Sequence, residues 1–203
     1  MRSAKIERKT RETDIKLELD LDGGDYSIDT NCGFLNHMLE LFACHSGFGL
    51  NVKCVGDVDV DFHHTVEDVG IALGQAFSQA IGDKKGIARY SHMILPMDEA
   101  LVLCAIDISG RGTLNYDVVI ESAKVTDDSD VVKQKSVGLF DTELIEEFFT
   151  SFVREARITL HLVKMYSKNT HHIIEGCFKA FARTLASASR IVGGGVPSSK
   201  GLL

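Results

Sequence analysis

The sequence lacks the segments that attach a protein to a membrane or carry it across one. Residues 1–16 are charged throughout and have no apolar core of the kind found in signal peptides. No stretch elsewhere approaches the roughly 18 consecutive apolar residues that a membrane-spanning helix needs. The sequence therefore predicts a soluble, cytoplasmic protein without a membrane partner.

Paired cysteines are also missing. The chain has five cysteines, an odd number, and no two of them form a C-x-x-C pair. Most lie in apolar runs, as Cys104 does within residues 101–106. We interpret them as reduced and mostly buried thiols, which agrees with a reducing compartment.

Positive charge is scarce, and so are linkers. The formal net charge is −7 and aromatic residues make up 7% of the chain, which argues against an extended nucleic-acid surface. A local basic pocket for one small phosphate remains compatible with that balance. No stretch rich in Pro, Ser or Gly separates two domains, and 203 residues with 44% apolar content are enough for one core. We therefore expect a single domain, residues 1–203.

Hydrophobic periodicity predicts a mixture of strands and helices. Alternating or short buried apolar runs indicate strands at 15–21, 52–60, 101–108, 114–120 and 158–163. Helical spacing indicates helices at 34–44, 65–81, 142–157 and 170–191. The DGGD sequence at 22–25 has the turn chemistry of a hairpin, and the polar segment 124–137 is expected to be a surface excursion.

An internal duplication is the strongest organisational signal. HHTVE at 63–67 and HHIIE at 171–175 share the pattern H-H-x-x-E, and each opens a predicted helix that contains small residues. Each motif follows a strand, and another helix precedes that strand. We expect two similar halves, approximately 1–90 and 91–192, followed by a flexible glycine-rich tail at 193–203.

The duplicated motif has the chemistry of a metal site. One histidine and the glutamate of each H-H-x-x-E unit lie on neighbouring parts of a helical face, while the adjacent histidine points about 100° away. A single His-His pair is more often a surface or capping feature, but repetition at two matched helix starts favours metal binding. Imidazoles mixed with carboxylates suit Mn, Fe, Co or Zn.

Two further residues extend the candidate ligand set. His37 lies 26 residues before His63, and Glu147 lies 24 residues before His171, so these two occupy matching places in the halves. Either Glu147 is a ligand, or it is an ordinary exposed helix residue beside Glu146. The ligand interpretation gives two metals with four protein ligands each.

Six ordered blocks resemble imidazoleglycerol-phosphate dehydratase. They are GFLNHML at 33–39, DFHHTVED at 61–68, PMDEA at 96–100, DISGR at 107–111, KNTHHIIE at 168–175 and PSSKG at 197–201. The resemblance runs from residue 11 to residue 200. It implies an α+β fold, in which a half like domain 2 of ribosomal protein S5 is duplicated in tandem. Each half would be a small mixed or antiparallel sheet packed on helices in two layers.

The resemblance also implies an activity. A hydro-lyase would convert D-erythro-imidazoleglycerol phosphate to imidazole acetol phosphate and water, in L-histidine biosynthesis, through an imidazolate stabilised by two Mn²⁺ ions in each active site. The implied metal ligands are His37, His63, His64, Glu67, Glu147, His171, His172 and Glu175. The implied assembly is a homo-oligomer of 24 chains whose active sites are shared between neighbouring chains.

The same resemblance assigns further roles. Catalysis would involve Glu12, as the acid and base, together with Glu67 and Glu175. The implied substrate and phosphate contacts are Glu12, His45, Arg89, Arg111, Lys179, Ser198 and Lys200. Three residues depart from the family pattern, which usually has Asp at Asn36, often Gln at Leu41 and usually His at Glu147. Asp98 could support a metal ligand or could be an ordinary surface acid.

Two other classes of function compete with this interpretation. A dinuclear hydrolase would use its metals to generate hydroxide, but the cationic residues that suit a phosphate clamp argue against it. A metal-stabilised RNA-binding module on the same fold is weakened by the acidic balance and by the absence of aromatic stacking motifs. Metal-dependent turnover of imidazoleglycerol phosphate would discriminate between the three.

Overall fold

The elements of the computed structural model, which describes residues 2–120, 136–201 and 203, follow the same order in each half of the chain. The first half contains β1 (Ser3–Lys9), β2 (Thr13–Asp20), β3 (Tyr26–Asp29), α1 (Gly33–Ser46), β4 (Gly49–Gly56) and α2 (His63–Ile81). The second contains β5 (Tyr90–Met97), β6 (Ala100–Asp107), β7 (Thr113–Asp117), α3 (Leu144–Ala156), β10 (Thr159–Tyr166) and α4 (Thr170–Ser189). The short strands β8 (Ser136–Val137) and β9 (Phe140–Asp141) precede α3. Residues 124–135 of the surface excursion expected at 124–137 lie outside the described residues.

The two halves have the same sheet topology. The strand order is β1-β2-β4-β3 in one sheet and β5-β6-β10-β7 in the other. In both sheets adjacent strands among the first three of this order pair antiparallel. The last strand of the order, β3 or β7, pairs in parallel with the strand beside it, β4 or β10. The predicted duplicated α+β fold is therefore confirmed.

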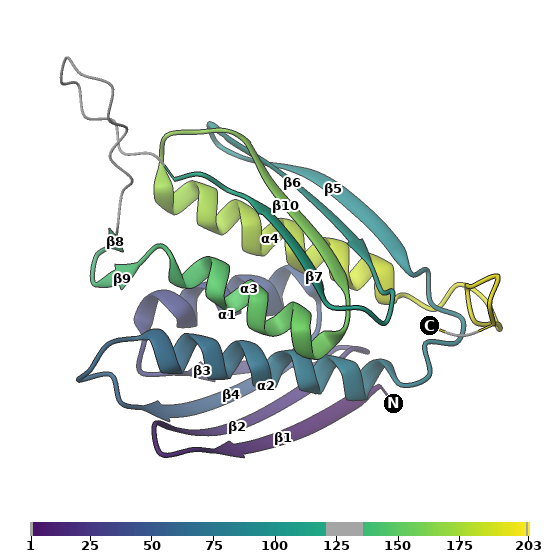
Figure 1. The fold of residues 1–203 in the computed structure, drawn as a ribbon, viewed down its shortest axis with the longest axis horizontal. Helices are drawn as coiled ribbons and strands as arrows, with labels where there is room; N and C mark the ends of the chain where they lie inside the picture. The colour runs from purple at the N-terminus through teal and green to yellow at the C-terminus, as the bar shows by residue number, and fades with distance from the viewer. Residues whose placement is uncertain (1, 121–135, 202) are drawn as a thin grey trace.

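The helices lie between the two sheets. Figure 1 shows the first sheet on one side of the helices and the second sheet on the other. Each half therefore consists of a sheet layer and a helix layer, and the helix layers of the two halves pack against each other. Helix α2 packs on α3, and α1 packs on α4. Buried phenylalanines fill both contacts: the ring centroids of Phe77 and Phe152 are 6.0 Å apart between α2 and α3, and those of Phe42 and Phe181 are 5.5 Å apart between α1 and α4. None of the helices among the described residues is long and apolar enough to cross a bilayer.

The contact between α2 and α3 is close because α2 carries glycines on that side. A Cβ atom on Gly74 would lie 2.5 Å from the carbonyl oxygen of Phe152, and one on Gly70 would lie 2.8 Å from that of Phe148. These positions let the two helix backbones approach each other more closely than alanine would permit. The start of α2 is thereby held against the start of α3.

The prediction of a hairpin at residues 22–25 is wrong. Strand β3 pairs in parallel with β4 and does not pair with β2, whose two edges are taken by β1 and β4. Gly23 and Gly24 instead carry the chain past the end of the sheet with φ angles of 119° and 139°, which favour glycine. The hairpin of this half is formed by β1 and β2, with Lys9 opposite Asp14.

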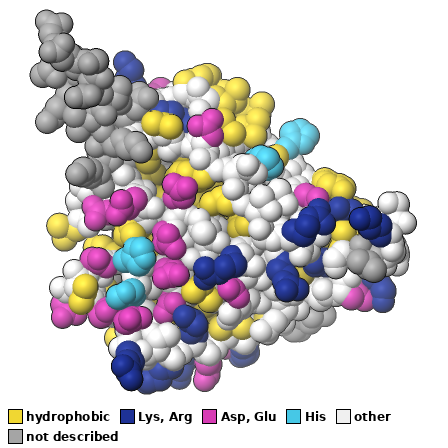
Figure 2. Space-filling model, viewed as in Figure 1, with side chains coloured by type: hydrophobic (Ala, Val, Ile, Leu, Met, Phe, Trp, Pro, Cys, Tyr) yellow, Lys and Arg dark blue, Asp and Glu magenta, His cyan; other side chains and the backbone are white. Residues whose placement is uncertain are grey.

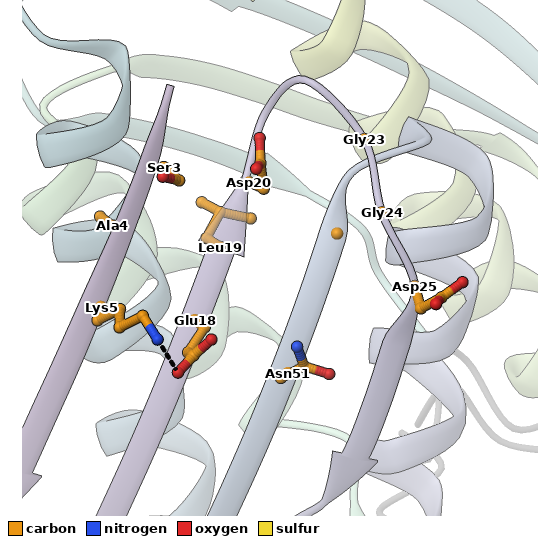
Figure 3. Close-up of a pocket in the computed structure, with 11 residues that line it drawn as sticks. Ser3, Ala4, Lys5, Glu18, Leu19, Asp20, Gly23, Gly24, Asp25 and Asn51 are labelled. Atoms are coloured by element: carbon orange, nitrogen blue, oxygen red, sulfur yellow. Dashed lines mark hydrogen bonds and ion pairs between the residues drawn. The ribbon is translucent and has the colours of Figure 1, made fainter. Parts of the chain in front are cut away.

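The outer face of the first sheet carries a shallow groove. It is lined by residues of β1, β2 and β4 and by the loop after β2, and the ion pair between Lys5 and Glu18 joins β1 to β2 within this lining (Figure 3). None of the candidate site residues lines it. The groove is therefore separate from the candidate active site.

Candidate active site

Six of the eight candidate metal ligands form two clusters of three residues, and a third group among the described residues joins the candidate ligand His172 to Asp98 and Glu99. The first cluster is His37, His171 and Glu175, and the second is His63, Glu67 and Glu147. In each cluster the ligand atoms lie within 4.8 Å of one another. The two clusters are counterparts under the duplication, because α1 corresponds to α3 and α2 corresponds to α4.

Each cluster takes ligands from both halves of the chain. In the first, α1 provides His37 while α4 provides the other two residues; in the second, α3 provides Glu147 while α2 provides the other two. This follows from the fold, since α1 packs on α4 and α2 packs on α3. The clusters thus depend on the docking of the halves.

A buried carboxylate anchors the first cluster. Glu175 Oε1 lies 3.0 Å from His37 Nε2 and 3.1 Å from His171 Nε2. Glu175 Oε2 accepts a hydrogen bond of 2.6 Å from Lys179 Nζ. Burial raises the pKa of Glu175. Hydrogen bonds from Lys179 and His37 and the positive charge of Lys179 have the opposite effect and outweigh burial, so that the pKa is lowered to about 2. An ionised carboxylate between two imidazoles suits a divalent cation.

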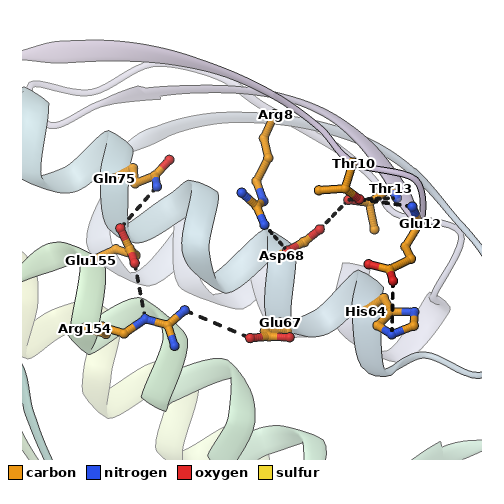
Figure 4. A network of polar contacts seen from close by, with 10 residues as sticks. All are labelled: Arg8, Thr10, Glu12, Thr13, His64, Glu67, Asp68, Gln75, Arg154 and Glu155. Atoms are coloured by element: carbon orange, nitrogen blue, oxygen red, sulfur yellow. Dashed lines mark hydrogen bonds and ion pairs between the residues drawn. The ribbon is translucent and has the colours of Figure 1, made fainter.

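The second cluster is half-buried and adjoins a chain of ion pairs. Glu67 Oε1 lies 4.0 Å from Arg154 Nη2, and Arg154 Nε donates to Glu155 at 3.2 Å, as Figure 4 shows. Glu147 lies in the first turn of α3 and is half-buried. Its neighbour Glu146 is exposed and outside the cluster. The alternative in which Glu147 is a plain exposed residue therefore fits the structure less well.

The second histidine of each H-H-x-x-E motif points away from both clusters. His64 Nδ1 lies 3.0 Å from Asp57 Oδ2, and a hydrogen bond to Asp57 raises the pKa of His64. His172 Nδ1 lies 2.9 Å from Glu99 Oε2, and that hydrogen bond lowers the pKa of Glu99. The described residues of one chain therefore do not supply the four protein ligands that were expected for each of two metals.

Glu12 lies beside His64. Its Oε1 atom is 3.9 Å from His64 Nε2, and its side chain is about half exposed. Asp68 ties the turn that carries Glu12 to α2, because Asp68 accepts hydrogen bonds from Thr13 Oγ1 and Arg8 Nη2 at 2.5 and 2.8 Å (Figure 4). The candidate acid and base is thereby held close to a candidate ligand.

Two candidate substrate residues lie close to the first cluster. Besides Glu175, Lys179 Nζ contacts Met97 Sδ at 3.2 Å. Burial lowers the pKa of His45, and the nearby charges of Lys179 and Arg183 lower it further. His45 lies in the last turn of α1, and its lowered pKa favours the uncharged form of the imidazole.

The remaining candidate phosphate residues lie around the C-terminal tail. Arg89 Nη1 donates to the carbonyl oxygen of Pro197 at 2.7 Å, while its Nε donates to Asp107 at 2.8 Å. The backbone amide of Lys200 donates to Ser198 Oγ at 3.2 Å. Arg111 is exposed and directly follows Gly110, and the C-terminal residue, Leu203, lies close to Gly110. Figure 2 shows Lys and Arg side chains gathered at this end of the molecule.

Comparison with known proteins identifies the family of the chain. The family model of imidazoleglycerol-phosphate dehydratase matches residues 30–185. The chain is 50% identical to the imidazoleglycerol-phosphate dehydratase of Caldicellulosiruptor saccharolyticus over 203 residues, which cover all of this chain and 98% of that protein. The chain belongs to the imidazoleglycerol-phosphate dehydratase family. It is a hydro-lyase that dehydrates imidazoleglycerol phosphate in histidine biosynthesis.

Solved structures of the same family share the fold. The dehydratase from Staphylococcus aureus is 40% identical, with a TM-score of 0.79 over 92% of this chain and 97% of that chain. The dehydratase from Pyrococcus furiosus is 34% identical, with a TM-score of 0.80 over 98% of this chain and all of that chain.

Two of the residues expected to depart from the family pattern have a visible structural role. Asn36 Oδ1 accepts hydrogen bonds from the backbone amide and the hydroxyl of Thr30 at 2.9 and 2.6 Å, which fixes the chain before α1. Leu41 packs against the hydrophobic core. Asn36 thus supports the element that carries His37.

Three residues that contact candidate site residues were not singled out from the sequence. They are Asp57 beside His64, Glu99 beside His172, and Arg154 beside Glu67. Asp98 was the acid considered, but its neighbour Glu99 makes the contact with His172. Asp57 and Glu99 stand next to strand ends, as many surface acids do, and Arg154 is one of several exposed charges on the helices, so no signal in the sequence sets them apart.

Proposed function

We propose that the dehydration takes place at a centre of two manganese ions. The observation that carries this proposal is the pair of three-ligand clusters that match under the duplication. The donor set of imidazoles and carboxylates fits manganese, and Glu175 is ionised at every physiological pH. Two ions at such a centre would stabilise negative charge on the imidazole ring of the substrate.

We further propose that each centre is shared between chains of a 24-chain homo-oligomer. Three ligands leave a coordination sphere open, while His64 and His172 carry Nε2 atoms that belong to neither cluster. One such histidine from another copy would give each ion four protein ligands. Symmetric assembly supplies that histidine to every site at once.

The other candidate residues then take distinct tasks. Glu12 would move the proton of the reacting carbon, because its carboxylate is exposed and adjoins a ligand histidine. Glu67 and Glu175 hold the ions and orient the substrate ring. Arg89, Arg111, Ser198 and Lys200 would bind the phosphate, for which the planar guanidinium is well matched. His45 and Lys179 would contact the substrate beside the first cluster.

A cytoplasmic location is part of the proposal. All five cysteines are free, and four of them are buried. Reduced thiols are the normal state of cysteine in the cytosol.

Metal removal tests the proposed centre. Chelated protein should lose turnover of imidazoleglycerol phosphate, and added Mn²⁺ should restore it together with two bound ions per chain by elemental analysis. Full activity with one ion or none would overturn the dimetal centre. Metal-dependent hydrolysis of the phosphate would favour the hydrolase class, and RNA binding without turnover would favour a binding module.

A further inference from the structure

The duplication makes Glu99 the counterpart of Glu12. Glu12 directly precedes Thr13, the first residue of β2, and Glu99 directly precedes Ala100, the first residue of β6. Strands β1 and β2 correspond to β5 and β6 in sheet order and in pairing. Both glutamates therefore end the turn that links the first two strands of their half.

The two glutamates contact equivalent histidines through different ring nitrogens. Glu12 Oε1 faces His64 Nε2 at 3.9 Å, which is too long for a hydrogen bond. Glu99 Oε2 instead lies 2.9 Å from His172 Nδ1, within hydrogen-bond distance. The equivalent glutamates thus stand in different relations to their histidines.

In the first half another carboxylate takes the Nδ1 position. Asp57, which follows β4, places Oδ2 3.0 Å from His64 Nδ1. Each of the two histidines therefore has a carboxylate on Nδ1, although the carboxylates come from different loops. In both halves Nε2 is left for another partner.

The carboxylate of Glu99 is itself fixed. Ser167 Oγ donates to Glu99 Oε1 at 3.2 Å, and Ser167 lies just after β10, where Asp57 lies after the corresponding strand β4. The start of the α4 helix is held in turn by Asn169, whose side chain accepts from the backbone amide of His172 at 3.3 Å. The contact between Glu99 and His172 is therefore part of a built arrangement.

We propose that Glu99 is a positioning residue that holds His172 by Nδ1 and presents Nε2 to a metal ion, as Asp57 does for His64. A neutral imidazole that ligates through one nitrogen carries its proton on the other, so a carboxylate at Nδ1 fixes both the tautomer and the ring orientation. With Asp57 in that role, Glu12 remains free to move protons. The inference rests on the dimetal centre proposed above.

Metal affinity in the absence of substrate tests this role. In Glu99→Gln the affinity for one of the two Mn²⁺ ions should fall about 10–100-fold, the usual effect of losing a carboxylate behind a histidine ligand. Asp98→Asn is the stricter comparison, because it removes the same charge from the same turn and from a carboxylate whose oxygen lies within 4.8 Å of the ligand atoms of Glu99 and His172. Its φ of 49° suits asparagine, and it should bind Mn²⁺ as the parent does.

The titration includes two reference variants. Glu12→Gln should keep parental Mn²⁺ affinity while kcat falls by a factor on the order of 10²–10⁴. His172→Ala should lose one ion. If Glu12→Gln weakens Mn²⁺ binding as much as Glu99→Gln does, the division of tasks between the equivalent glutamates is wrong.

The outcomes separate this inference from the proposed function. A parent protein that does not bind two Mn²⁺ ions overturns the dimetal centre itself. A parent that binds two, a His172→Ala variant that binds one and a Glu99→Gln variant with parental affinity would overturn only the role of Glu99. Weaker binding in Asp98→Asn with parental binding in Glu99→Gln would transfer the positioning role to Asp98.

Discussion

Glu147 shows how one residue can differ between equivalent places without disrupting a cluster. It matches His37 under the duplication, yet it contributes a carboxylate where its counterpart contributes an imidazole. A carboxylate keeps the number of ligands and adds one negative charge to the second cluster. That charge should bind a cation more tightly but reduce its power to attract electrons from the substrate.

Substitutions at this helix start test the ligand role. Glu147→Ala should lose one metal ion and nearly all turnover, because two protein ligands would remain in the cluster. Glu147→His should retain both ions, since histidine is a competent ligand. Glu146→Ala is the control and should have little effect, because Glu146 is exposed and outside the cluster. Metal content and turnover of the three variants decide the matter, and two ions with full rate in Glu147→Ala would contradict the prediction.

At the scale of elements, the close contact between α2 and α3 determines where the second cluster forms. Gly74→Ala should lower stability by about 1–3 kcal/mol, because the added Cβ would lie 2.5 Å from the carbonyl oxygen of Phe152. Helix propensity alone favours alanine over glycine by about 1 kcal/mol, so packing and propensity predict opposite signs. Denaturant unfolding of the variant measures the sign of the change in its free energy of unfolding.

Gly33→Ala serves as the comparison for that substitution. Gly33 opens α1, and no atom lies within 4 Å of the position its Cβ would take. It should unfold no more easily than the parent. Equal stability of the Gly74→Ala variant and the parent would mean that the helices can move apart without cost.

Most elements could be predicted from the sequence because their apolar periodicity is local. Helix α3 and strand β6 both show it, since their buried side chains repeat at the spacing of one face. Strand β1 was missed because it carries exposed charged residues and only Ile6 is buried among its residues. The partner of β3 could not be predicted, because strand pairing depends on which edges other strands already occupy.

The site was predictable to the extent that it depends on helix starts. The H-H-x-x-E spacing fixes the direction of each ligand around its own helix, so His63 with Glu67 and His171 with Glu175 were expected together. Which helix faces which is a matter of tertiary packing. The sequence therefore could not show that Asp57 and Glu99 hold His64 and His172 away from both clusters.

At the scale of the whole assembly, shared sites predict complementation between inactive variants. His64→Asn and Glu175→Gln should each be inactive alone. Co-assembled at equal amounts, they should regain activity in about a quarter of the sites, where a chain with intact Glu175 meets a neighbour with intact His64. Turnover of the mixed oligomer measures the recovered activity. The control is a mixture of the two variants that were assembled separately before they were combined. No recovery would place both residues of a site in one chain.

The tail offers a second test at this scale. Removal of residues 196–203 should leave the assembly intact and abolish turnover, since the hydrogen bond between the amide of Gly86 and the carbonyl of Gly195 is retained while Arg89 loses the carbonyl of Pro197. Lys200→Met should raise KM, whereas Lys85→Met, an exposed lysine paired with Asp83, should not. Kinetics near those of the parent in the truncated protein would remove Lys200 from the phosphate site.

Both clusters are made from residues of the two halves, and this has an evolutionary consequence. A half-length ancestor could have formed both clusters by pairing with a copy of itself around a two-fold axis, and the clusters would then have been identical. Fusion of the two copies into one gene released each position from that identity. An ancestral residue shared by His37 and Glu147, or by Glu12 and Glu99, could from then on acquire a different task in each copy.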